Sequence, residues 1–331
     1  MRWLVVLPFE RPGFMGMDFA DEIRRVGHEV RTFPYRRENA FYKNRSTKLT
    51  YQRVIGAKLE RVCAEWRPSI VLVIKGSPIF PGLIRRIRAR TGALFLNLFP
   101  DNPLVMMPLE CVEAYDLFFV KDHYAQRSLE SVGMRNLYYL PLYCVPELHH
   151  PVDLSADERA RFGASISFVG SRYPYRERFV KSLARHPIRL WGAGWSKSGD
   201  AEIRAMVAGS LVFGRDKLCV YSGSVVSLNH HHPLNDICGV NTRAFELAAS
   251  GACQLADLKE DLAALFKPGQ EVLTYRELPE LERQLEYCLG HPDEAREIGA
   301  NARQRALAEH TLRHRIDEIL TVVDARFGAR A

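Results

Sequence analysis

Short apolar runs alternate with segments of helical periodicity along the first half of the chain, and this alternation constrains the fold more than any other feature. Candidate strands, bounded by Pro, Gly or polar residues, lie at 3–8, 27–35, 69–74, 94–99, 115–121 and 136–142. Segments with the apolar spacing of helices separate them at 16–26, 51–66, 81–90 and 124–132. Crossovers of this length join parallel strands with a right-handed turn and place helices on both faces of the sheet. The first half therefore predicts a doubly wound, Rossmann-like α/β domain.

A second α/β pattern begins after a polar, proline-bearing stretch at 143–162, which we interpret as a linker. Further strands are expected at 165–171, 188–192, 225–228 and 253–256, and helices at 177–184, 278–289, 292–309 and 312–327. The predicted organisation is a first domain over 1–150, a second Rossmann-like domain over 151–310, and a final helix in 311–331 that packs back toward the first domain. Two such domains in sequence predict a cleft walled by the carboxyl ends of both parallel sheets.

Composition and charge exclude several classes of protein. The 331 residues are 47% hydrophobic and 26% charged, as is usual for globular domains. Seven cysteines are scattered singly without a C-x-x-C pair, so we expect a reducing compartment. The first apolar run is too short for a signal peptide, and no segment approaches the ~18 apolar residues of a membrane span, so a soluble, cytoplasmic protein is expected. The net charge of +7 indicates solvated helix faces, with an anionic membrane surface or a polyanion as the alternative partner. No nucleic-acid-binding module is found.

The stretch from Val225 to Leu255 combines a strand, a long polar loop, a short helix and a further strand, which is how α/β domains hold ligands. Asn241 or Thr242 can cap the helix, which stops at Gly251. Glu246 lies one turn into this helix, where the helix dipole favours a carboxylate. Such a carboxylate can accept two hydrogen bonds from a vicinal diol such as a ribose. The alternative is a surface glutamate that only stabilises the helix.

A glycine ends the strand at 165–171, and this turn is a candidate phosphate site. Gly170 and Ser171 leave backbone N–H groups at the mouth of the following helix, and such groups favour a phosphate. Many α/β turns contain glycine, so an ordinary turn is the alternative. Arg172 and Arg176 follow immediately, with Arg243 and Lys217 as second candidates, and a solvated charge is the alternative for each.

Polar residues also follow the strands of the first half. Asp101, in Phe-Pro-Asp-Asn-Pro, comes directly after the strand at 94–99, where it could orient or deprotonate an acceptor hydroxyl. An aspartate before Asn-Pro is also an ordinary turn former. Glu10 and the run Lys75-Gly76-Ser77 are further candidates for the wall of the site.

Three consecutive histidines, His230 to His232, invite a metal assignment together with His149 and His150. Consecutive residues of an extended loop point in different directions, and no carboxylate or cysteine completes a ligand set at recognisable spacing. We therefore expect no metal, and favour contact of one histidine with a sugar or a diphosphate. No G-x-S-x-G elbow supports a serine hydrolase.

Several segments together resemble a known family. They are R-x-F-E-x-x-A-x-G at 243–251, GQEVLTYRELPELERQLEYCL at 269–289, Glu309-His310-Thr311 with Arg315, FVGSRYPYRERF at 168–179, VYSGSVVSLN at 220–229 and, more loosely, FPDNP at 99–103 and YYLPL at 138–142. In combination they are similar to the spore-maturation-type (CgeB-like) glycosyltransferases. The resemblance implies the GT-B architecture, in which two Rossmann-like domains face each other across a cleft.

The resemblance also implies roles for individual residues. Glu246 matches the glutamate that binds the ribose of a nucleotide sugar, and Arg172 and Arg176 match basic positions that neutralise the departing diphosphate. A second glutamate, expected eight positions before Glu246, is replaced by Cys238. We hypothesise that Asn235, Asp236 or backbone amides around Gly239 substitute for it. Similarity to the retaining group suggests retention of configuration without a metal ion.

The sequence therefore predicts a glycosyltransferase of the hexosyltransferase type that uses a nucleotide-diphosphate sugar as donor and needs no cofactor. The acceptor is a glycan, a lipid-linked molecule, a protein or a small molecule, and basic helices of the first domain offer a route to peripheral membrane association. The residues expected to act in transfer are Asp101, Arg172 and Arg176. Those expected to bind the donor are Gly170, Ser171, Lys217, Asn229, His231, Arg243 and Glu246. A sugar-nucleotide epimerase or hydrolase, and an inactive nucleotide-binding scaffold, are the alternatives.

Overall fold

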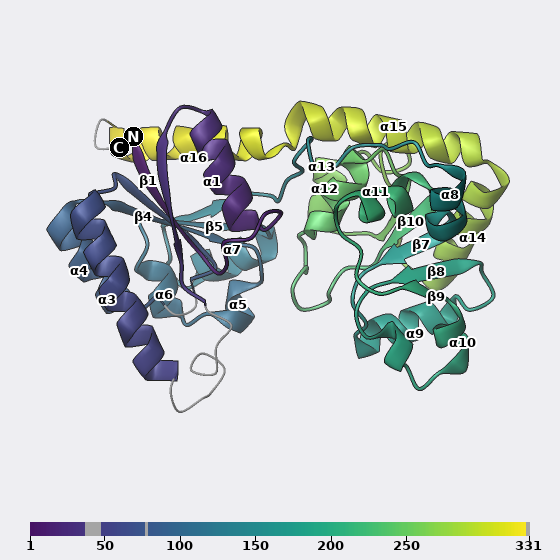
Figure 1. Ribbon diagram of the computed structural model, residues 1–331, viewed down its shortest axis with the longest axis horizontal. Helices are drawn as coiled ribbons and strands as arrows, with labels where there is room; N and C mark the ends of the chain where they lie inside the picture. Colours follow the sequence, from purple (N-terminus) through teal and green to yellow (C-terminus); the bar gives the residue numbers. More distant parts are fainter. Residues whose placement is uncertain (37–47, 77–78, 329–331) are drawn as a thin grey trace. The chain divides into compact units, whose positions relative to one another are not determined.

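The computed structural model describes residues 1–36, 48–76 and 79–328, and the chain divides into two compact units (Figure 1). Unit 1 consists of Met1–Leu142, Leu234–Gly239 and Leu312–Ala331. Unit 2 consists of Tyr143–Pro233 and Val240–Thr311. Residues 234–239 fall within the range that the sequence assigns to the second domain, but in the structure they belong to unit 1.

Unit 1 is built on a six-stranded parallel sheet in the order β2-β1-β3-β4-β5-β6. Its strands are β1 (Arg2–Leu7), β2 (Glu29–Pro34), β3 (Ile70–Ile74), β4 (Leu94–Phe99), β5 (Leu117–Val120) and β6 (Leu137–Tyr139). The middle strands β3 and β4 are buried along their whole length, and Asn97 of β4 is the one polar residue in these two strands, because helices cover both faces of the sheet.

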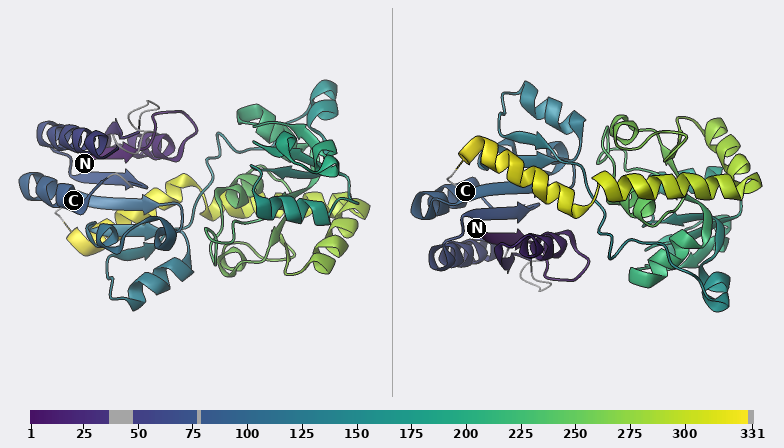
Figure 2. Two further views of the ribbon diagram at one scale, coloured as in Figure 1. Left: turned by 90° about the horizontal axis from the view of Figure 1, so that it is seen from below. Right: turned by 90° about the horizontal axis from the view of Figure 1, so that it is seen from above.

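The helices of unit 1 are α1 (Met15–Arg25), α3 (Lys48–Trp66), α4 (Pro81–Thr91), α5 (Pro103–Met106), α6 (Leu109–Glu113), α7 (His123–Ser131) and α16 (Leu312–Phe327). Helices α3 and α4 pack together and share one core with alternate residues of the strands. Helix α16 packs beside α1 and lies across the strands, as Figure 2 shows in the view from above. The last described helix of the chain thus completes the unit that the first strand begins.

Unit 2 has the same architecture, with strand order β12-β11-β10-β7-β8-β9 and parallel pairing throughout. Its strands are β7 (Ala164–Val169), β8 (Ile188–Trp191), β9 (Val207–Gly209), β10 (Ser224–Asn229), β11 (Gln254–Asp257) and β12 (Leu273–Tyr275). Its α-helices are α8 (Ala156–Phe162), α9 (Pro174–Ser182), α10 (Ala201–Ala205), α11 (Gly214–Ser222), α12 (Thr242–Ala249), α13 (Glu260–Leu265), α14 (Leu278–Gly290) and α15 (Pro292–Glu309).

The predicted fold class is confirmed, because both units are doubly wound parallel sheets. Three local predictions need correction. The interpreted linker contains α8, which Ser155 and Glu158 start with a reciprocal capping box. Helix α9 begins at Pro174 and ends at Ser182, whereas the sequence predicts a helix over 177–184. Strands β9 and β12 are three residues long and were not predicted.

Each sheet has a point at which the strand order reverses. In unit 1 the chain runs from β1 to β2 and then returns to place β3 on the other side of β1. In unit 2 it runs from β7 through β8 to β9 and then places β10 on the other side of β7. Ligands of open α/β sheets bind at the carboxyl ends of the strands beside such a point. The ends of β7 and β10 in unit 2, and of β1 and β3 in unit 1, are therefore the first places to look for function.

Candidate functional site

The ends of β7 and β10 bring two groups of predicted site residues together in unit 2. These strands are paired in parallel, with Leu228 opposite Phe168. Gly170 and Ser171 follow β7, while Asn229 ends β10 and His231 follows it. The strand order thus places residues that are about 60 positions apart in the sequence at one edge of the sheet.

Two guanidinium groups converge on Gly170. A Cβ atom built on this glycine would lie 2.8 Å from Nη2 of Arg243 and 3.3 Å from Nη1 of Arg176. Both guanidinium groups also lie over the Phe168 ring, with ring centroids 5.6 Å from Arg176 and 5.7 Å from Arg243. Arg176 is largely buried and Arg243 is half-buried, and two like charges held this close attract an anion. The arrangement fits a phosphate group at the end of β7.

Each of these arginines is held by its own hydrogen bond. Arg176 comes from the first turn of α9, and its Nη1 donates to the Ser171 carbonyl oxygen at 3.1 Å. Arg243 comes from the first turn of α12, and its Nη1 donates to Oδ1 of Asn229 at 3.1 Å. Because the two helices start close to the sheet edge, their first turns deliver both side chains to the same glycine.

Asn229 is fully buried and acts as a scaffold. Its Oδ1 accepts from Nδ2 of Asn241 at 2.8 Å, and its Nδ2 donates to Oε1 of Gln254 at 2.8 Å. Asn241 is also the N-cap of α12, accepting from the Ala244 N–H, which settles the choice between Asn241 and Thr242. Asn229 therefore fixes Arg243 and the start of α12 at once, a role that the sequence did not reveal.

Glu246 lies further along α12, in a cluster of polar side chains. Its Oε1 is 3.1 Å from Nζ of Lys217 and 3.7 Å from Nε2 of His149. Burial raises the pKa of the Glu246 carboxyl, but Lys217 and His149 outweigh burial and hold this pKa below its ordinary value. Glu246 is therefore ionised at neutral pH and accepts hydrogen bonds only.

Besides Lys217, Tyr221 and His149 each present a proton to Glu246. Burial, and then the Glu246 carboxylate, raise the pKa of Tyr221, so that its hydroxyl stays protonated and donates to Oε2 at 3.5 Å. His149 accepts the Val145 N–H at Nδ1, which leaves the proton of the neutral ring on Nε2, facing Glu246. Burial lowers the pKa of His149 to about 4, so the ring is neutral at pH 7. The sequence named His149 only among the histidines that could contact a sugar or a diphosphate, and it did not indicate Tyr221, which lies in another element.

Two predicted cations do not lie at Gly170. Lys217, in α11, pairs with Glu246 instead. Arg172 pairs with Glu177, its Nε donating to Oε2 at 2.9 Å. Its role in neutralising a diphosphate stays a prediction.

The histidine run divides among several contacts. His231 is buried, its Nδ1 lies 2.7 Å from Oδ1 of Asp257, and its Nε2 has no hydrogen-bond partner within the described part of the chain. The ring of His230 stacks on Phe179 with centroids 4.1 Å apart, and that of His232 meets Tyr175 edge-on at 5.1 Å. Residues 1–36, 48–76 and 79–328 contain no group of three or more His, Cys, Asp or Glu side chains arranged to hold a metal ion.

The loop that was expected to replace the second glutamate is held by Asp122 and Lys121. The N–H groups of Ile237, Cys238 and Gly239 all donate to Oδ2 of Asp122, at 2.8, 3.1 and 2.9 Å. Asp236 forms a buried ion pair with Lys121. Asn235 accepts the Asn102 N–H at 2.8 Å. These groups, suggested as substitutes for the sugar-binding glutamate, are therefore engaged by residues of unit 1.

In unit 1, Asp101 lies at the carboxyl end of β4 and pairs with Lys75, which follows β3. Glu10, after β1, accepts a hydrogen bond from Thr32. Ser77 lies outside the described residues. The two polar residues that the sequence placed after β3 and β4 are thus in contact with each other.

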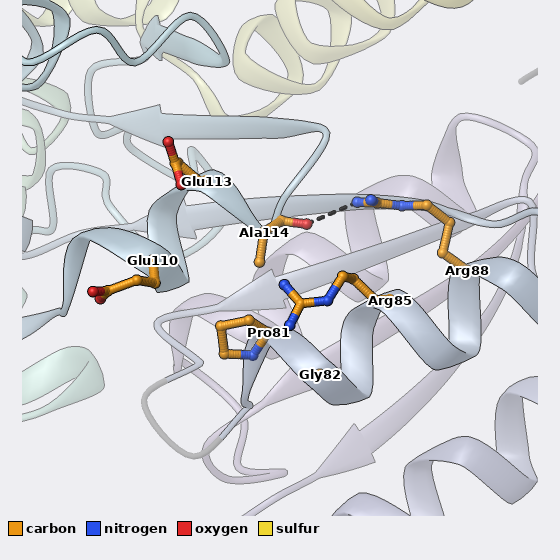
Figure 3. A pocket seen from close by; sticks show the side chains of 7 residues that line it. All are labelled: Pro81, Gly82, Arg85, Arg88, Glu110, Glu113 and Ala114. Carbon is orange, nitrogen blue, oxygen red and sulfur yellow. Dashed lines mark hydrogen bonds between the residues drawn. The ribbon is translucent and has the colours of Figure 1, made fainter.

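A pocket of about 530 Å³ lies between α4 and α6 (Figure 3). Its lining includes Arg85, Arg88, Glu110 and Glu113, whose charges offset one another, and Arg88 donates to the Ala114 carbonyl oxygen at 2.8 Å. No predicted site residue lines this pocket.

Among the described helices, none has the length and apolar character needed to cross a membrane.

Comparison with known proteins identifies the fold. The sucrose-phosphate synthase of Thermosynechococcus elongatus superposes with a TM-score of 0.74 at 15% identity, covering 99% of this chain and 100% of the other. HepE of Anabaena, solved in complex with UDP, gives 0.70 at 12% identity with coverage of 98% and 100%. A glycosyltransferase of Rickettsia africae gives 0.69 at 12% identity, with coverage of 98% of both chains.

At the level of sequence, no curated protein matches the chain. Residues 172–321 match a family model described as glycosyl transferase-like. This range includes Arg176, Lys217, Asn229, Arg243 and Glu246. The predicted GT-B fold is confirmed by its likeness to solved glycosyltransferases, and the greater part of unit 2 matches the glycosyl transferase-like family.

Proposed function

We propose that the protein is a glycosyltransferase of the spore-maturation type that transfers a hexose from a nucleoside-diphosphate sugar to an acceptor hydroxyl. Unit 2 binds the donor, and unit 1 binds the acceptor. The observation that carries the proposal is the convergence of Arg176 and Arg243 on Gly170, beside the point where the strand order of unit 2 reverses. Two fixed cations at this point match the charge of a diphosphate.

The position of Glu246 supports a nucleotide rather than a free phosphate. Glu246 and Arg243 are three residues apart on α12, so they lie on neighbouring parts of one helix surface. A ribose between them would place its diol at the ionised Glu246 and its 5′-diphosphate at Arg243. HepE, which has a similar fold, has been solved with UDP and with UDP-glucose, so a uridine nucleotide is the first donor to test.

The chemistry that we propose is transfer with retention and without a metal ion. As the bond from the sugar to the diphosphate breaks, negative charge grows on the leaving oxygen, and preorganised cations stabilise it most at that moment. Arg176 and Arg243 supply this charge in place of a metal. Arg172 would join them only after leaving Glu177. In unit 1, Asp101 orients the acceptor hydroxyl.

The test is calorimetric titration with UDP and other nucleoside diphosphates, and we expect binding in the micromolar range. Arg243→Met should lower the affinity by roughly tenfold to a hundredfold, because it removes a charge-assisted contact. Glu246→Gln should lower the affinity for UDP but leave that for pyrophosphate unchanged, since only UDP carries a ribose. Arg215→Met is a matched control, because Arg215 pairs with Glu158 on the surface of unit 2.

Binding of UDP with equal affinity to wild type and Arg243→Met would remove the diphosphate assignment. Equal effects of Glu246→Gln on UDP and pyrophosphate would remove the ribose assignment. A screen of nucleotide sugars for release of the nucleoside diphosphate then identifies the donor.

A further inference from the structure

Lys75 has a backbone conformation that its residue type disfavours. Its φ is +63°, in the left-handed region, and among the described non-glycine residues only Arg67 shares a positive φ. Left-handed backbone brings the Cβ atom of an L-residue too close to its own carbonyl region, which is why glycine usually occupies it. Lys75 follows β3, beside the point where the strand order of unit 1 reverses.

The surrounding structure imposes this conformation. The hydroxyl of Tyr35 donates to the Ile74 carbonyl oxygen at 3.0 Å and accepts the Gly76 N–H at 3.2 Å. Nδ2 of Asn97 donates to the Lys75 carbonyl oxygen at 3.1 Å. Tyr35 and Asn97 are fully buried, so the turn is fixed by groups that cannot relax into solvent.

Gly76 leaves no room for an alternative path of the chain. A Cβ atom on it would lie 2.5 Å from Cγ1 of Val73 and 2.8 Å from the Tyr115 hydroxyl. The chain must therefore turn sharply at 75 and 76. A glycine at position 75 would turn without strain, so the geometry of the turn does not explain a lysine there.

The side chain of Lys75 explains it better, because its ammonium group pairs with Asp101. The two residues follow neighbouring strands, β3 and β4, and both keep part of their side chain exposed at the sheet edge. Strained backbone that its surroundings over-determine is typical of functional sites. The strained turn at Lys75 aims an ammonium group at one carboxylate.

We propose that Lys75 is a positioning residue that holds the Asp101 carboxylate in the orientation in which it meets the acceptor hydroxyl. This inference rests on the proposed function, in which Asp101 acts on the acceptor. It adds that a lysine at position 75 lowers the stability of the fold but raises the rate of transfer.

The experiment compares four variants in the full-length protein: Lys75→Gly, Lys75→Met, Lys75→Arg and, as a control, Lys58→Met on the exposed surface of α3. The melting temperature is measured without ligand. The kcat and donor KM are measured as release of nucleoside diphosphate from the nucleotide sugar found in the screen, with glycerol as the hydroxyl acceptor.

We expect Lys75→Gly to raise the melting temperature by about 2 °C or more, because glycine relieves the left-handed strain. Its kcat should fall by roughly tenfold or more while the donor KM stays unchanged, because the donor binds in unit 2. Lys75→Met should lose kcat to the same extent without the gain in melting temperature. Lys75→Arg should keep most of the kcat, and Lys58→Met should change neither quantity.

A melting temperature that falls in Lys75→Gly would show that the lysine is structural and would overturn the inference. An unchanged kcat in Lys75→Gly, measured beside an active wild type, would also overturn the inference, but it would not contradict the proposed function. If the wild-type protein turns over none of the nucleotide sugars, both the proposed function and the proposed role of Lys75 are wrong.

Discussion

Gly170 and Gly192 lie against each other at the end of β7, and different kinds of atoms fill the space around them. A Cβ on Gly170 would meet side chains alone: the ends of Arg243 and Arg176, 2.8 and 3.3 Å away, and the edge of the Phe168 ring at 3.2 Å. A Cβ on Gly192, where φ is +149°, would lie 2.0 Å from the Gly170 carbonyl oxygen. The first contact can be relieved by moving a side chain, whereas the second requires the backbone of two strand ends to separate.

These two glycines therefore give a matched pair of variants. Gly170→Ala should change the free energy of unfolding by less than about 1 kcal/mol but lower the affinity for UDP by roughly tenfold, because it displaces Arg176 and Arg243. Gly192→Ala should cost about 3 kcal/mol or more, through overpacking against backbone. Thermal melting and calorimetry on both variants test this. Unchanged UDP affinity in a well-folded Gly170→Ala would place the diphosphate away from the end of β7.

At Lys75 the balance of two effects decides the sign of the stability change. Left-handed backbone costs a non-glycine residue about 1–2 kcal/mol. A partly exposed ion pair such as Lys75 with Asp101 contributes about 0–1 kcal/mol. Relief of the backbone strain outweighs loss of the ion pair, which is why replacement by glycine is expected to stabilise the fold while it removes a functional group.

At the scale of elements, the loop 234–239 and helix α7 depend on one carboxylate. Oδ1 of Asp122 accepts the N–H groups of Tyr124 and Ala125 and so caps α7, while Oδ2 accepts the three amides of Ile237, Cys238 and Gly239. Gly239 also packs closely, since a Cβ there would lie 2.6 Å from the Lys121 carbonyl oxygen. One side chain thus joins a helix start to a loop more than 110 residues further along the chain.

Replacing Asp122 with alanine should therefore cost more than the loss of a helix cap. We expect about 2–4 kcal/mol, because the variant loses the cap and leaves three partly or fully buried amides without an acceptor. Ser155→Ala is the control, since Ser155 caps only α8 at an exposed site and its loss should cost about 1 kcal/mol.

Hydrogen exchange provides a second readout for the same pair of variants. The amides of 237–239 should exchange much faster in Asp122→Ala and stay unchanged in Ser155→Ala. Equal costs in the two variants, or unchanged exchange at 237–239, would contradict the role of Asp122 in holding the loop.

The sequence predicts elements well where burial imposes a pattern. Strand β3 is apolar throughout, and β4 and β7 are mostly apolar, because both of their faces are covered, and the cap at Asn241 follows from its side-chain chemistry. Prediction from the sequence fails for β9, because its three residues Val-Ala-Gly show no periodic pattern. It also fails for loop 234–239, because nothing near the loop in the sequence indicates that its acceptor is Asp122.

The site follows the same rule. Gly170, Asn229 and Arg243 could be predicted as neighbours because strand ends and helix starts meet at one edge of a parallel sheet. The pairing of Lys217 with Glu246 could not be predicted, because it depends on how α11 packs in the folded unit, and the role of Lys217 in donor binding stays a prediction. His149 pairs with Glu246 although nothing in the spacing of these residues suggests it.

For the whole molecule, α16 is a structural part of unit 1. Arg315 is buried, and its Nε donates to the carbonyl oxygens of Pro141 and Leu142 at 2.9 and 3.2 Å. Ile316, Ile319 and Val323 of the same helix are also buried. Fully burying such side chains stabilises a fold by about 1.5–3 kcal/mol each, so the helix contributes a large share of the stability of unit 1.

Removing residues 312–331 should therefore unfold unit 1 at a lower temperature while unit 2 retains UDP binding. Calorimetric melting should resolve the two transitions in the truncated protein, and saturating UDP should raise only the one that belongs to unit 2. Removing residues 329–331 alone is the control. A truncated protein that melts like the full-length protein would contradict the role of α16.

Unit 1 is assembled from three separate stretches, so the chain passes between the units at 142/143, 233/234, 239/240 and 311/312. A single recombination crossover between residues 142 and 234 would combine Asp122 from one parent with residues 237–239 from the other, and Leu142 from the first parent with Arg315 from the second. Unit 1 can therefore be inherited or exchanged intact only when all three stretches are transferred together. Chimaeras that combine unit 1 of one protein with unit 2 of another need four junctions, and the six residues 234–239 must be transferred together with the rest of unit 1.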